Sequence, residues 1–417
     1  MDFKKSRWES SPKLQKSKLK NDLKGSTPKT SPSLLSENQT FGTSYSNDPL
    51  SYHLISKCRS INEHYEMLNK IEEGTYGVVY RAKNRNSGEI VALKHLKIDK
   101  SYSGFPITSL REIYTLKNSK HPHLINIREI VVGNSINSVY IVMDYVEHDL
   151  KVLITNMPSA FLQSEIKTLM LQLLSAVEFL HKNHIIHRDL KTSNLLMNNS
   201  GQIKVADFGL ARKYSSPLLP MTNIVVTLWY RAPELLFGET KYSTSVDMWS
   251  VGCIFAELID KEPLFPGTSE ISQISKIFSL LGTPDKNTWP EFDLLPSSQL
   301  FSFKKQSHSK LREKFLNLTQ NGIDLLSKML DFNPKTRISA SEALNHPYFR
   351  ESPYPKDPSL FPTWPSKSSG EIRKAYNSPS APKHDDDVSP TSKQIVFSDI
   401  FENASKNTDK AGFKLRL

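Results

Sequence analysis

The sequence predicts an α+β protein in which a strand-rich part precedes a helix-rich part, with a polar segment at each end. Three observations support this prediction. Residues 65–97 alternate apolar and polar side chains around glycines, whereas residues 164–181 repeat apolar side chains at helical spacing. Both ends of the chain are rich in Ser, Pro and Lys, a composition that buries too little apolar surface to offset the entropy lost on ordering.

The individual elements follow from these patterns. Strands joined by tight turns are predicted within residues 65–97, and the β-branched run at 139–143 predicts another strand. The segment 245–260 is apolar nearly all round, which indicates a helix buried in the helical part. Further helices are predicted at 164–181, 269–281 and 322–330.

Composition excludes several classes of protein. The chain has 54 Lys and Arg against 43 Asp and Glu, a net charge of +11. Two cysteines, Cys58 and Cys253, are too few for a disulfide framework or a thiolate zinc site. No apolar run approaches the roughly 18 residues of a membrane span, and the first residues lead into polar sequence without a secretory apolar region. We therefore expect a soluble, intracellular protein with no membrane partner.

The two ends are predicted to be disordered: a basic arm at residues 1–60 and a tail at 366–417. The charge of the arm has two interpretations. One is solubility, and the other is nuclear import or contact with nucleic acid.

Three short segments suggest phosphate chemistry when they are read together. Gly74 and Gly77 lie at a strand turn, where backbone N–H groups can approach phosphate oxygens, although an ordinary hairpin has the same pattern. Lys94 lies on an apolar strand, where burial is unfavourable unless the ammonium meets anions; the alternative is a surface Lys at a strand end. Glu112 opens an apolar helical stretch and would orient that ammonium.

A fourth segment, residues 186–194, is followed by Asp207 in an Ala-Asp-Phe-Gly sequence. Its Asp189 and Asn194, together with Asp207, supply oxygen ligands suited to magnesium and a group suited to a hydroxyl nucleophile. Taken alone, this fourth segment could equally consist of solvated polar residues in a loop. The order of the four segments along the chain, ending in Ala-Pro-Glu at 232–234, matches the signature set of protein kinases.

The sequence therefore resembles a eukaryotic protein kinase, and specifically the PITSLRE subfamily of cyclin-dependent kinases, whose seven-residue signature stands at 106–112. The similarity runs from about residue 61 to residue 365 and includes the segments 227–234, 246–253 and 281–284. It implies a two-lobed fold with ATP in the cleft between the lobes. The implied parts are an N-lobe of strands with one helix at 61–146, a mostly helical C-lobe at 147–350, and an extension packed on the kinase at 351–365.

The resemblance also implies catalytic roles. Lys94 would hold the α- and β-phosphates of ATP and would be positioned by Glu112. Asp189 would accept the proton of the substrate hydroxyl or orient that hydroxyl, and Lys191 would neutralise charge on the phosphoryl group in transfer.

The resemblance implies one set of residues for Mg²⁺ and another for ATP. Asn194 and Asp207 would bind Mg²⁺. Met143 resembles the gatekeeper, residues 144–146 the hinge, and Glu72 replaces the glycine that usually begins the loop. The residues implied to contact ATP are Ile71, Glu72, Glu73, Gly74, Thr75, Tyr76, Gly77, Val78, Val79, Ala92, Lys94, Met143, Asp144, Val146 and Leu196.

Substrate specificity follows from two further matches. The position of Lys191 after His-Arg-Asp-Leu resembles the serine/threonine type of kinase. In the family the residue matching Val226 has a left-handed backbone, and Arg231 holds its carbonyl turned away. That carbonyl cannot accept an N–H from the substrate, and proline has none to offer, so a proline after the target residue is predicted.

Phosphorylation is predicted to regulate the enzyme. Thr222 matches the activating phosphothreonine of the family, and the alternative is an ordinary loop threonine. Three arginines match those that surround the phosphate: Arg111, Arg188 and Arg212. Phosphate on Thr75 or Tyr76, between the loop glycines, would be inhibitory.

The resemblance implies a cyclin partner, of the L type, that turns Glu112 towards Lys94. It also implies a nuclear location, with the cytoplasm as a further one, and roles in transcription, RNA processing or cell-cycle control. Two other interpretations compete with this one. The first is a pseudokinase scaffold, which needs a lost catalytic residue, and the second is a nucleic-acid-binding module built on the basic arms.

Overall fold

The computed structural model describes residues 58–74, 77–98, 105–135, 138–300, 305–306 and 308–364. Its strands are β1 (Arg59–Ser60), β2 (Tyr65–Glu73), β3 (Gly77–Asn84), β4 (Ile90–Leu96), β5 (Ile127–Val132), β6 (Val139–Asp144), β7 (His148–Asp149), β8 (Ile185–Ile186), β9 (Leu195–Met197), β10 (Ile203–Val205) and β11 (Arg212–Lys213). Its α-helices are α1 (Ile61–His64), α2 (Ile107–Asn118), α3 (Leu150–Asn156), α4 (Gln163–Lys182), α5 (Pro233–Leu236), α6 (Ser245–Asp260), α7 (Glu270–Leu281), α8 (Leu311–Lys314), α9 (Gln320–Met329) and α10 (Ala340–Leu344).

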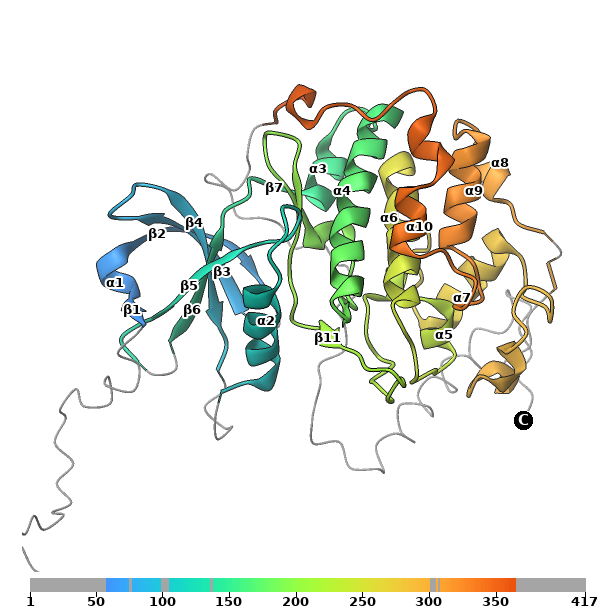
Figure 1. Ribbon diagram of the computed structural model, residues 1–417, viewed down its shortest axis with the longest axis horizontal. Coiled ribbons are helices and arrows are strands. Elements are labelled where there is room, and N and C mark those ends of the chain that lie inside the picture. Colours follow the sequence, from blue (N-terminus) through green and yellow to red (C-terminus); the bar gives the residue numbers. More distant parts are fainter. Residues whose placement is uncertain are drawn as a thin grey trace, which may run out of the picture. The chain divides into compact units, whose positions relative to one another are not determined.

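A six-stranded sheet, in the order β1-β5-β6-β4-β3-β2, forms the first part, and most of the helices form the second. Figure 1 shows α2 on the side of the sheet that faces the helical part, and the longer helices α4 and α6 within that part. The predicted α+β class, the predicted strands and the four predicted helices are confirmed.

The sheet places Lys94 by strand alternation. In β4 the side chains of Val91 and Leu93 are fully buried in a small core on one face of the sheet. Ala92 and Lys94 point to the opposite face, because successive residues of a strand alternate. Lys94 pairs across the sheet with Val79 on one side and Ile141 on the other. The lysine is therefore held on the face that looks towards the helices.

The helical part is built around α4 and α6. Fourteen of the sixteen residues of α6 are buried, as its apolar sequence predicts. In the described residues no helix combines the length and the apolarity needed to cross a membrane.

Several predictions on domain organisation fall beyond the described residues. The predicted disordered arm lies there apart from residues 58–60, of which Arg59 and Ser60 pair in parallel with β5. The predicted tail at 366–417 lies there entirely. The predicted lobe boundary at 146–147 falls between β6 and β7. Disorder at either end stays a prediction.

Candidate active site

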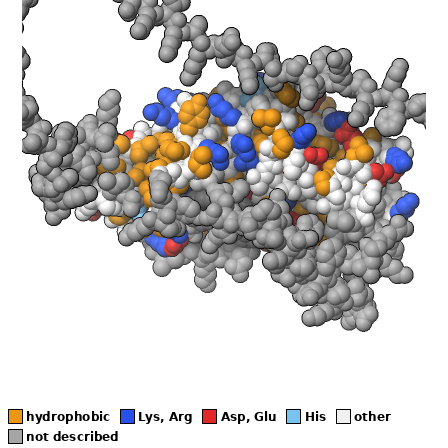
Figure 2. Space-filling view, turned by 90° about the horizontal axis from the view of Figure 1, so that it is seen from below, with side chains coloured by type: hydrophobic (Ala, Val, Ile, Leu, Met, Phe, Trp, Pro, Cys, Tyr) orange, Lys and Arg blue, Asp and Glu red, His pale blue; other side chains and the backbone are white. Residues whose placement is uncertain are grey.

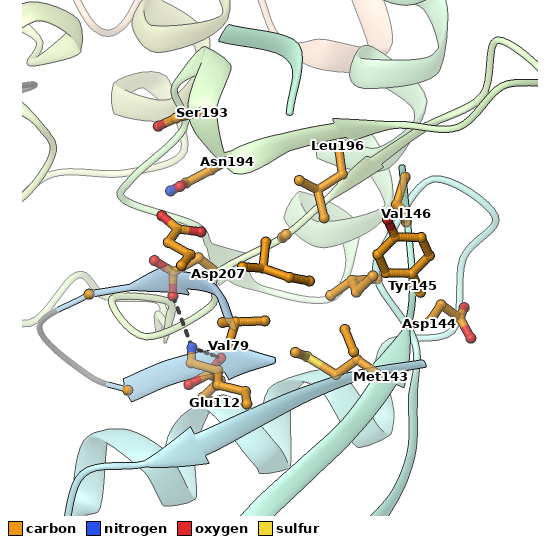
Figure 3. Close-up of a pocket in the computed structure, with 18 residues that line it drawn as sticks. Val79, Glu112, Met143, Asp144, Tyr145, Val146, Ser193, Asn194, Leu196 and Asp207 are labelled. Carbon is orange, nitrogen blue, oxygen red and sulfur yellow. Dashed lines mark hydrogen bonds and ion pairs between the residues drawn. The ribbon is translucent and has the colours of Figure 1, made fainter. Parts of the chain in front are cut away.

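A cavity lies between the sheet and the helical part, and residues from both contribute to it (Figure 3). Its two ends differ in character. Figure 3 shows Asn194 and Asp207 at one end and Met143, Tyr145 and Val146 at the other. The residues that line it are Ile71, Glu72, Gly74, Gly77, Val79, Ala92, Lys94, Glu112, Ile125, Met143, Asp144, Tyr145, Val146, Ser193, Asn194, Leu196, Ala206 and Asp207.

The apolar end has two walls. Val79 and Ala92 come from β3 and β4, and Leu196 comes from β9 on the opposite side. A slot with apolar walls suits a flat ring such as adenine. The side chain of Asp144 points away from this slot (Figure 3), where it accepts a hydrogen bond of 2.9 Å from Nε of Arg128.

Most residues predicted to contact ATP line the cavity, but Glu73 and Val78 do not. Glu73 faces solvent and pairs with Lys70 at 2.5 Å and with Lys97 at 3.0 Å, which lowers its pKa to about 2. Val78 is buried in the sheet opposite His95. Strand alternation turns these two side chains away from the cavity. The predicted contacts Thr75 and Tyr76 lie outside the described residues.

Ile125, Ser193 and Ala206 line the cavity although they were not predicted as site residues, and Tyr145 lies within the predicted hinge. Ser193 is the neighbour of Asn194 in the fourth segment, so its position in the motif was the available signal. Ile125 precedes β5, and its backbone N–H donates to the carbonyl of Val205 at 2.9 Å. Only the folded chain brings this segment to the cavity.

Lys94 lies between two carboxylates. Its Nζ is 2.5 Å from Oε1 of Glu112, which is 2% exposed, and 3.3 Å from Oδ1 of Asp207. Burial disfavours the charged ammonium, but the negative charges of Glu112 and Asp207 outweigh it and raise the pKa of Lys94. Lys94 is therefore a cation at neutral pH. Its ion pair with Glu112, which the family resemblance attributes to cyclin binding, is present in the single chain.

Asp207 is the second carboxylate of this cluster. Burial opposes its ionisation, but the positive charges of Lys94 and Lys191 hold the pKa of its carboxyl below the ordinary value. Its backbone φ is +61°, a left-handed conformation that is strained in a residue with a side chain. Such strain is often found where the surrounding structure fixes a functional group.

Asp189 is the centre of a second cluster, joined to the first by Asn194. Oδ1 of Asp189 accepts hydrogen bonds from the backbone N–H (3.1 Å) and the hydroxyl (2.9 Å) of Thr227. Its Oδ2 lies 2.9 Å from Nζ of Lys191 and accepts a bond of 3.1 Å from Nδ2 of Asn194. Asn194 also lines the cavity beside Asp207, so it links Asp189, which does not itself line the cavity, to the polar end.

The buried carboxylate of Asp247 holds the loop that carries Asp189, a role that was not predicted from the sequence. The two oxygens of Asp247 in α6 accept the backbone N–H groups of His187 and Arg188, each at 2.9 Å. Arg188 has a φ of +64°, so the loop is strained at this point. Asp247 appears in the sequence merely as part of an apolar helix, and its partners are distant in the chain.

The polar end can hold a divalent cation. Asn194 and Asp207 offer oxygen atoms, and the amide nitrogen of Asn194 is engaged with Asp189, which leaves its Oδ1 for a ligand. In the part of the chain that the structure describes, no three His, Cys, Asp or Glu side chains form a cage for a metal. A cation held by few protein ligands, with phosphate oxygens supplying the others, fits this donor set.

The segment after Asp207 has the geometry expected at Val226. Its φ is +66°, and its carbonyl oxygen accepts hydrogen bonds from Nε (3.3 Å) and Nη2 (3.1 Å) of Arg231. The predicted left-handed backbone and turned carbonyl are confirmed.

The surroundings of Thr222 are basic. The hydroxyl of Tyr242 donates to the Thr222 carbonyl at 2.6 Å and accepts from Nη1 of Arg188 at 2.9 Å. Burial raises the pKa of Tyr242, while the charges of Arg188 and Arg212 oppose the rise, so both guanidinium groups lie near it. Arg111 is exposed on α2. The role of these three arginines around a phosphate stays a prediction.

Comparison with known proteins agrees with this geometry. The family described as Protein kinase domain matches residues 65–349. The chain belongs to this family. A protein kinase domain uses ATP and a divalent cation.

The relatives of this kinase include cyclin-dependent kinases. It is 55% identical to the serine/threonine-protein kinase ppk23 of Schizosaccharomyces pombe over 76% of this chain and 80% of that protein. It is 54% identical to cyclin-dependent kinase 11B of Rattus norvegicus over 79% of this chain and 76% of that protein. With the form of Mus musculus the identity is 52% over 87% of this chain but 47% of that protein, so the kinase spans about half the length of that relative. The resemblance to the PITSLRE-type kinases is confirmed.

Proposed function

We propose that this chain is a cyclin-dependent protein kinase that transfers the γ-phosphate of ATP to Ser or Thr in protein substrates. The observation that carries the proposal is the meeting of Lys94, Asn194 and Asp207 at one end of one cavity, with Asp189 hydrogen-bonded to Asn194. A pseudokinase scaffold would lack at least one of these groups or Glu112, and each is present.

The chain's own residues would position the reactants. Lys94, fixed by Glu112, would hold the α- and β-phosphates of ATP. Thr227 and Lys191 fix the carboxylate of Asp189 from two sides, so that it can orient the substrate hydroxyl and accept its proton. The ammonium of Lys191 would neutralise charge that develops on the transferring phosphoryl group. Phosphoryl transfer needs little covalent help, so positioning and charge account for the catalysis.

We propose Mg²⁺ as the cation of this site, held by Asn194 and Asp207. When bound, it would bridge phosphate oxygens and neutralise their charge. The lowered pKa of Asp207 keeps the carboxylate ionised, as a hard cation requires.

Proline after the target residue is part of the proposal. The carbonyl of Val226 is engaged by Arg231 and does not face an incoming peptide as an acceptor. A substrate residue with a backbone N–H would leave that group unpaired on binding, whereas proline has no such group.

The proposed partner is a cyclin, of the L type by family resemblance. Helix α2 carries Glu112 on one face, and on the other it exposes Ile107 (55%), Leu110 (50%) and Tyr114 (56%). Their i, i+3, i+7 spacing forms one apolar stripe. Figure 2 shows hydrophobic side chains next to Lys and Arg side chains on the face seen from below. A partner that covers such a stripe could set the position of Glu112.

A nuclear location, with the cytoplasm as a further one, and roles in transcription, RNA processing or cell-cycle control are proposed from the family resemblance and the basic arm at residues 1–60. Contact between this arm and nucleic acid is a proposal of the same kind. Deleting residues 1–55 and following localisation, RNA retention and kinase activity separately would test them.

Phosphate transfer itself is the decisive test. The purified chain, with a cyclin subunit and labelled ATP, should phosphorylate a Ser-Pro peptide. Asp189→Asn keeps the size of the side chain but removes its negative charge, and it should reduce kcat by on the order of 10³-fold. If the wild-type chain transfers no phosphate with any cyclin, or if Asp189→Asn is as active as the wild type, the proposed function is wrong.

A further inference from the structure

Residues Glu351–Trp364, here called the C-terminal strap, extend beyond the residues that match the kinase family. Figure 1 shows this segment running from the region of α10 across one end of α4 towards β7. The strap therefore joins the far side of the helical part to the neighbourhood of the hinge.

The first half of the strap is fixed to α4. Nζ of Lys167, a side chain with no exposed surface, donates to the carbonyl of Glu351 at 2.9 Å. The backbone of Lys356 donates to the carbonyl of Ser164 at 3.0 Å and accepts from the hydroxyl of Thr168 at 2.5 Å. These bonds involve buried donors and main-chain atoms, so the strap has a defined path.

The second half packs on the turn between β9 and β10. Phe361 is 5% exposed and belongs to the main hydrophobic core. It lies against Gly201, which has a φ of +69°. A Cβ atom at Gly201 would be 2.4 Å from the carbonyl oxygen of Pro358 and 2.9 Å from the Phe361 ring. This close approach of two backbones requires glycine.

Trp364, the last described residue, connects the strap to the hinge side of the cavity. Its ring meets those of Phe161 and His148 edge to face, with centroids 6.1 Å and 6.4 Å away. His148 is the first residue of β7, two positions after the cavity-lining Val146, and its Nε2 lies 2.8 Å from Oδ1 of Asn199. The tryptophan therefore packs on the segment into which the hinge continues.

The contact reaches one wall and the end of the apolar slot. Strand β7 pairs with β9, where Asp149 stands opposite Leu196. Leu196 forms one wall of the slot, and Val146 lies at its end. A side chain that fixes β7 thus fixes two of the surfaces that would hold adenine.

We propose that Trp364 is a positioning residue for nucleotide binding, which acts through His148 and β7 on Val146 and Leu196. The proposal rests on the proposed function, since it concerns the same cavity. It makes the strap a part of the nucleotide site, although the strap contributes no atom to the cavity.

The test is direct binding of the non-hydrolysable analogue AMP-PNP with Mg²⁺ to the full chain, measured by calorimetry. Trp364→Ala should raise Kd about three- to tenfold, as expected for the loss of edge-to-face ring contacts. Trp364→Phe should stay within about twofold of the wild type because it keeps an aromatic ring. Leu360→Ala is the matched control, because this side chain lies on the same strap but is 66% exposed.

The outcomes separate the two proposals. A Trp364→Ala variant with the wild-type Kd and only a lower unfolding temperature would overturn the role of Trp364. Should that variant fail to fold, Trp364→Leu, which keeps apolar bulk, decides the matter: a wild-type Kd overturns the proposal and a raised one supports it. A chain that binds the analogue but transfers no phosphate would refute the proposed function and leave the binding role of Trp364 intact.

Discussion

Arg231 holds Val226 in a left-handed conformation by donating two hydrogen bonds to its carbonyl oxygen, from Nε at 3.3 Å and Nη2 at 3.1 Å. A β-branched residue is strained at a φ of +66°. Nη1 of the same guanidinium pairs with Oε1 of Glu270 at 2.6 Å. Burial lowers the pKa of Arg231, and Glu270 opposes that effect. The first turn of α7 thus supplies the charge that keeps this arginine in place.

We expect Glu270→Gln to weaken the preference for proline after the target residue. Without its anion, the buried guanidinium holds the Val226 carbonyl less firmly, and the strained backbone can relax. The relaxed carbonyl would accept an N–H from a residue other than proline. The ratio of kcat/KM between Ser-Pro and Ser-Ala peptides should fall by about tenfold, because a hydrogen bond to a charged group contributes roughly 1.5–3 kcal/mol.

Glu313→Gln is the control for this change, because it removes the same charge from an exposed position on α8. It should leave the ratio unchanged. Equal losses on both peptides in Glu270→Gln would indicate a general structural defect and would contradict the specific role.

Asp247 should contribute strongly to stability. Its oxygens accept the backbone N–H groups of His187 and Arg188 inside the protein, and Nε2 of His181 lies 3.0 Å from Oδ2. An Asn at this position turns an N–H₂ group towards a donor. We expect Asp247→Asn to lower the free energy of unfolding by about 3 kcal/mol, as for other broken buried charge networks, in chemical denaturation at pH 7.

The contribution of Asp247 to stability should depend on pH. Burial opposes the ionisation of Asp247, but His181 and the other donors lower the pKa of its carboxyl in the folded state. A group whose folded pKa is lowered stabilises the protein above its unfolded pKa, about 3.9. The difference in unfolding free energy between the wild type and Asp247→Asn should be full at pH 7 and shrink as pH falls below about 4. A difference that grows in acid would contradict this role.

The order of short motifs in the sequence was sufficient to predict the meeting of Lys94, Glu112 and Asp207, because together the motifs match the signature set of protein kinases. It could not predict Asp247 or Ile125 as parts of the site. The contacts of Asp247 with His187 and Arg188 span 59 or more positions of sequence, and Ile125 reaches the cavity through a contact between the two lobes. No local sequence pattern identifies either residue.

The pairing of the strands explains why two residues that were expected to contact ATP do not line the cavity. Glu73 and Val78 were expected to contact ATP because residues 71–79 were treated as one loop. In the paired hairpin these two residues stand opposite each other, on the face that turns away from the cavity. The pairing register was the missing information. The strap that carries Trp364 has no pattern of its own, since its path depends on the surfaces of α4 and β7.

Phosphate on Thr222 should activate the kinase. Arg188 and Arg212 lie near Tyr242, which holds the Thr222 carbonyl, so a phosphate there would meet positive charge. Thr222→Ala should lower the activity of protein purified from cells by more than about tenfold. Thr240→Ala, an exposed threonine of the same region, should have no effect. Wild-type activity of Thr222→Ala would contradict the regulation.

Asp207 should determine the requirement for magnesium. Its carboxylate lies 3.3 Å from Lys94 and keeps 39% of its side-chain surface exposed, towards the cavity that it lines. Asp207→Asn removes the negative charge, and the free Mg²⁺ needed for half-maximal activity should rise by at least about tenfold, since hard cations bind carboxylates more strongly than amides. The rise in unfolding temperature that Mg²⁺ and ADP together produce should shrink in parallel. Asp293→Asn, an exposed change of the same kind, should alter neither quantity. An unchanged Mg²⁺ dependence in Asp207→Asn would place the cation elsewhere, and Asn194 could then no longer be regarded as its second ligand.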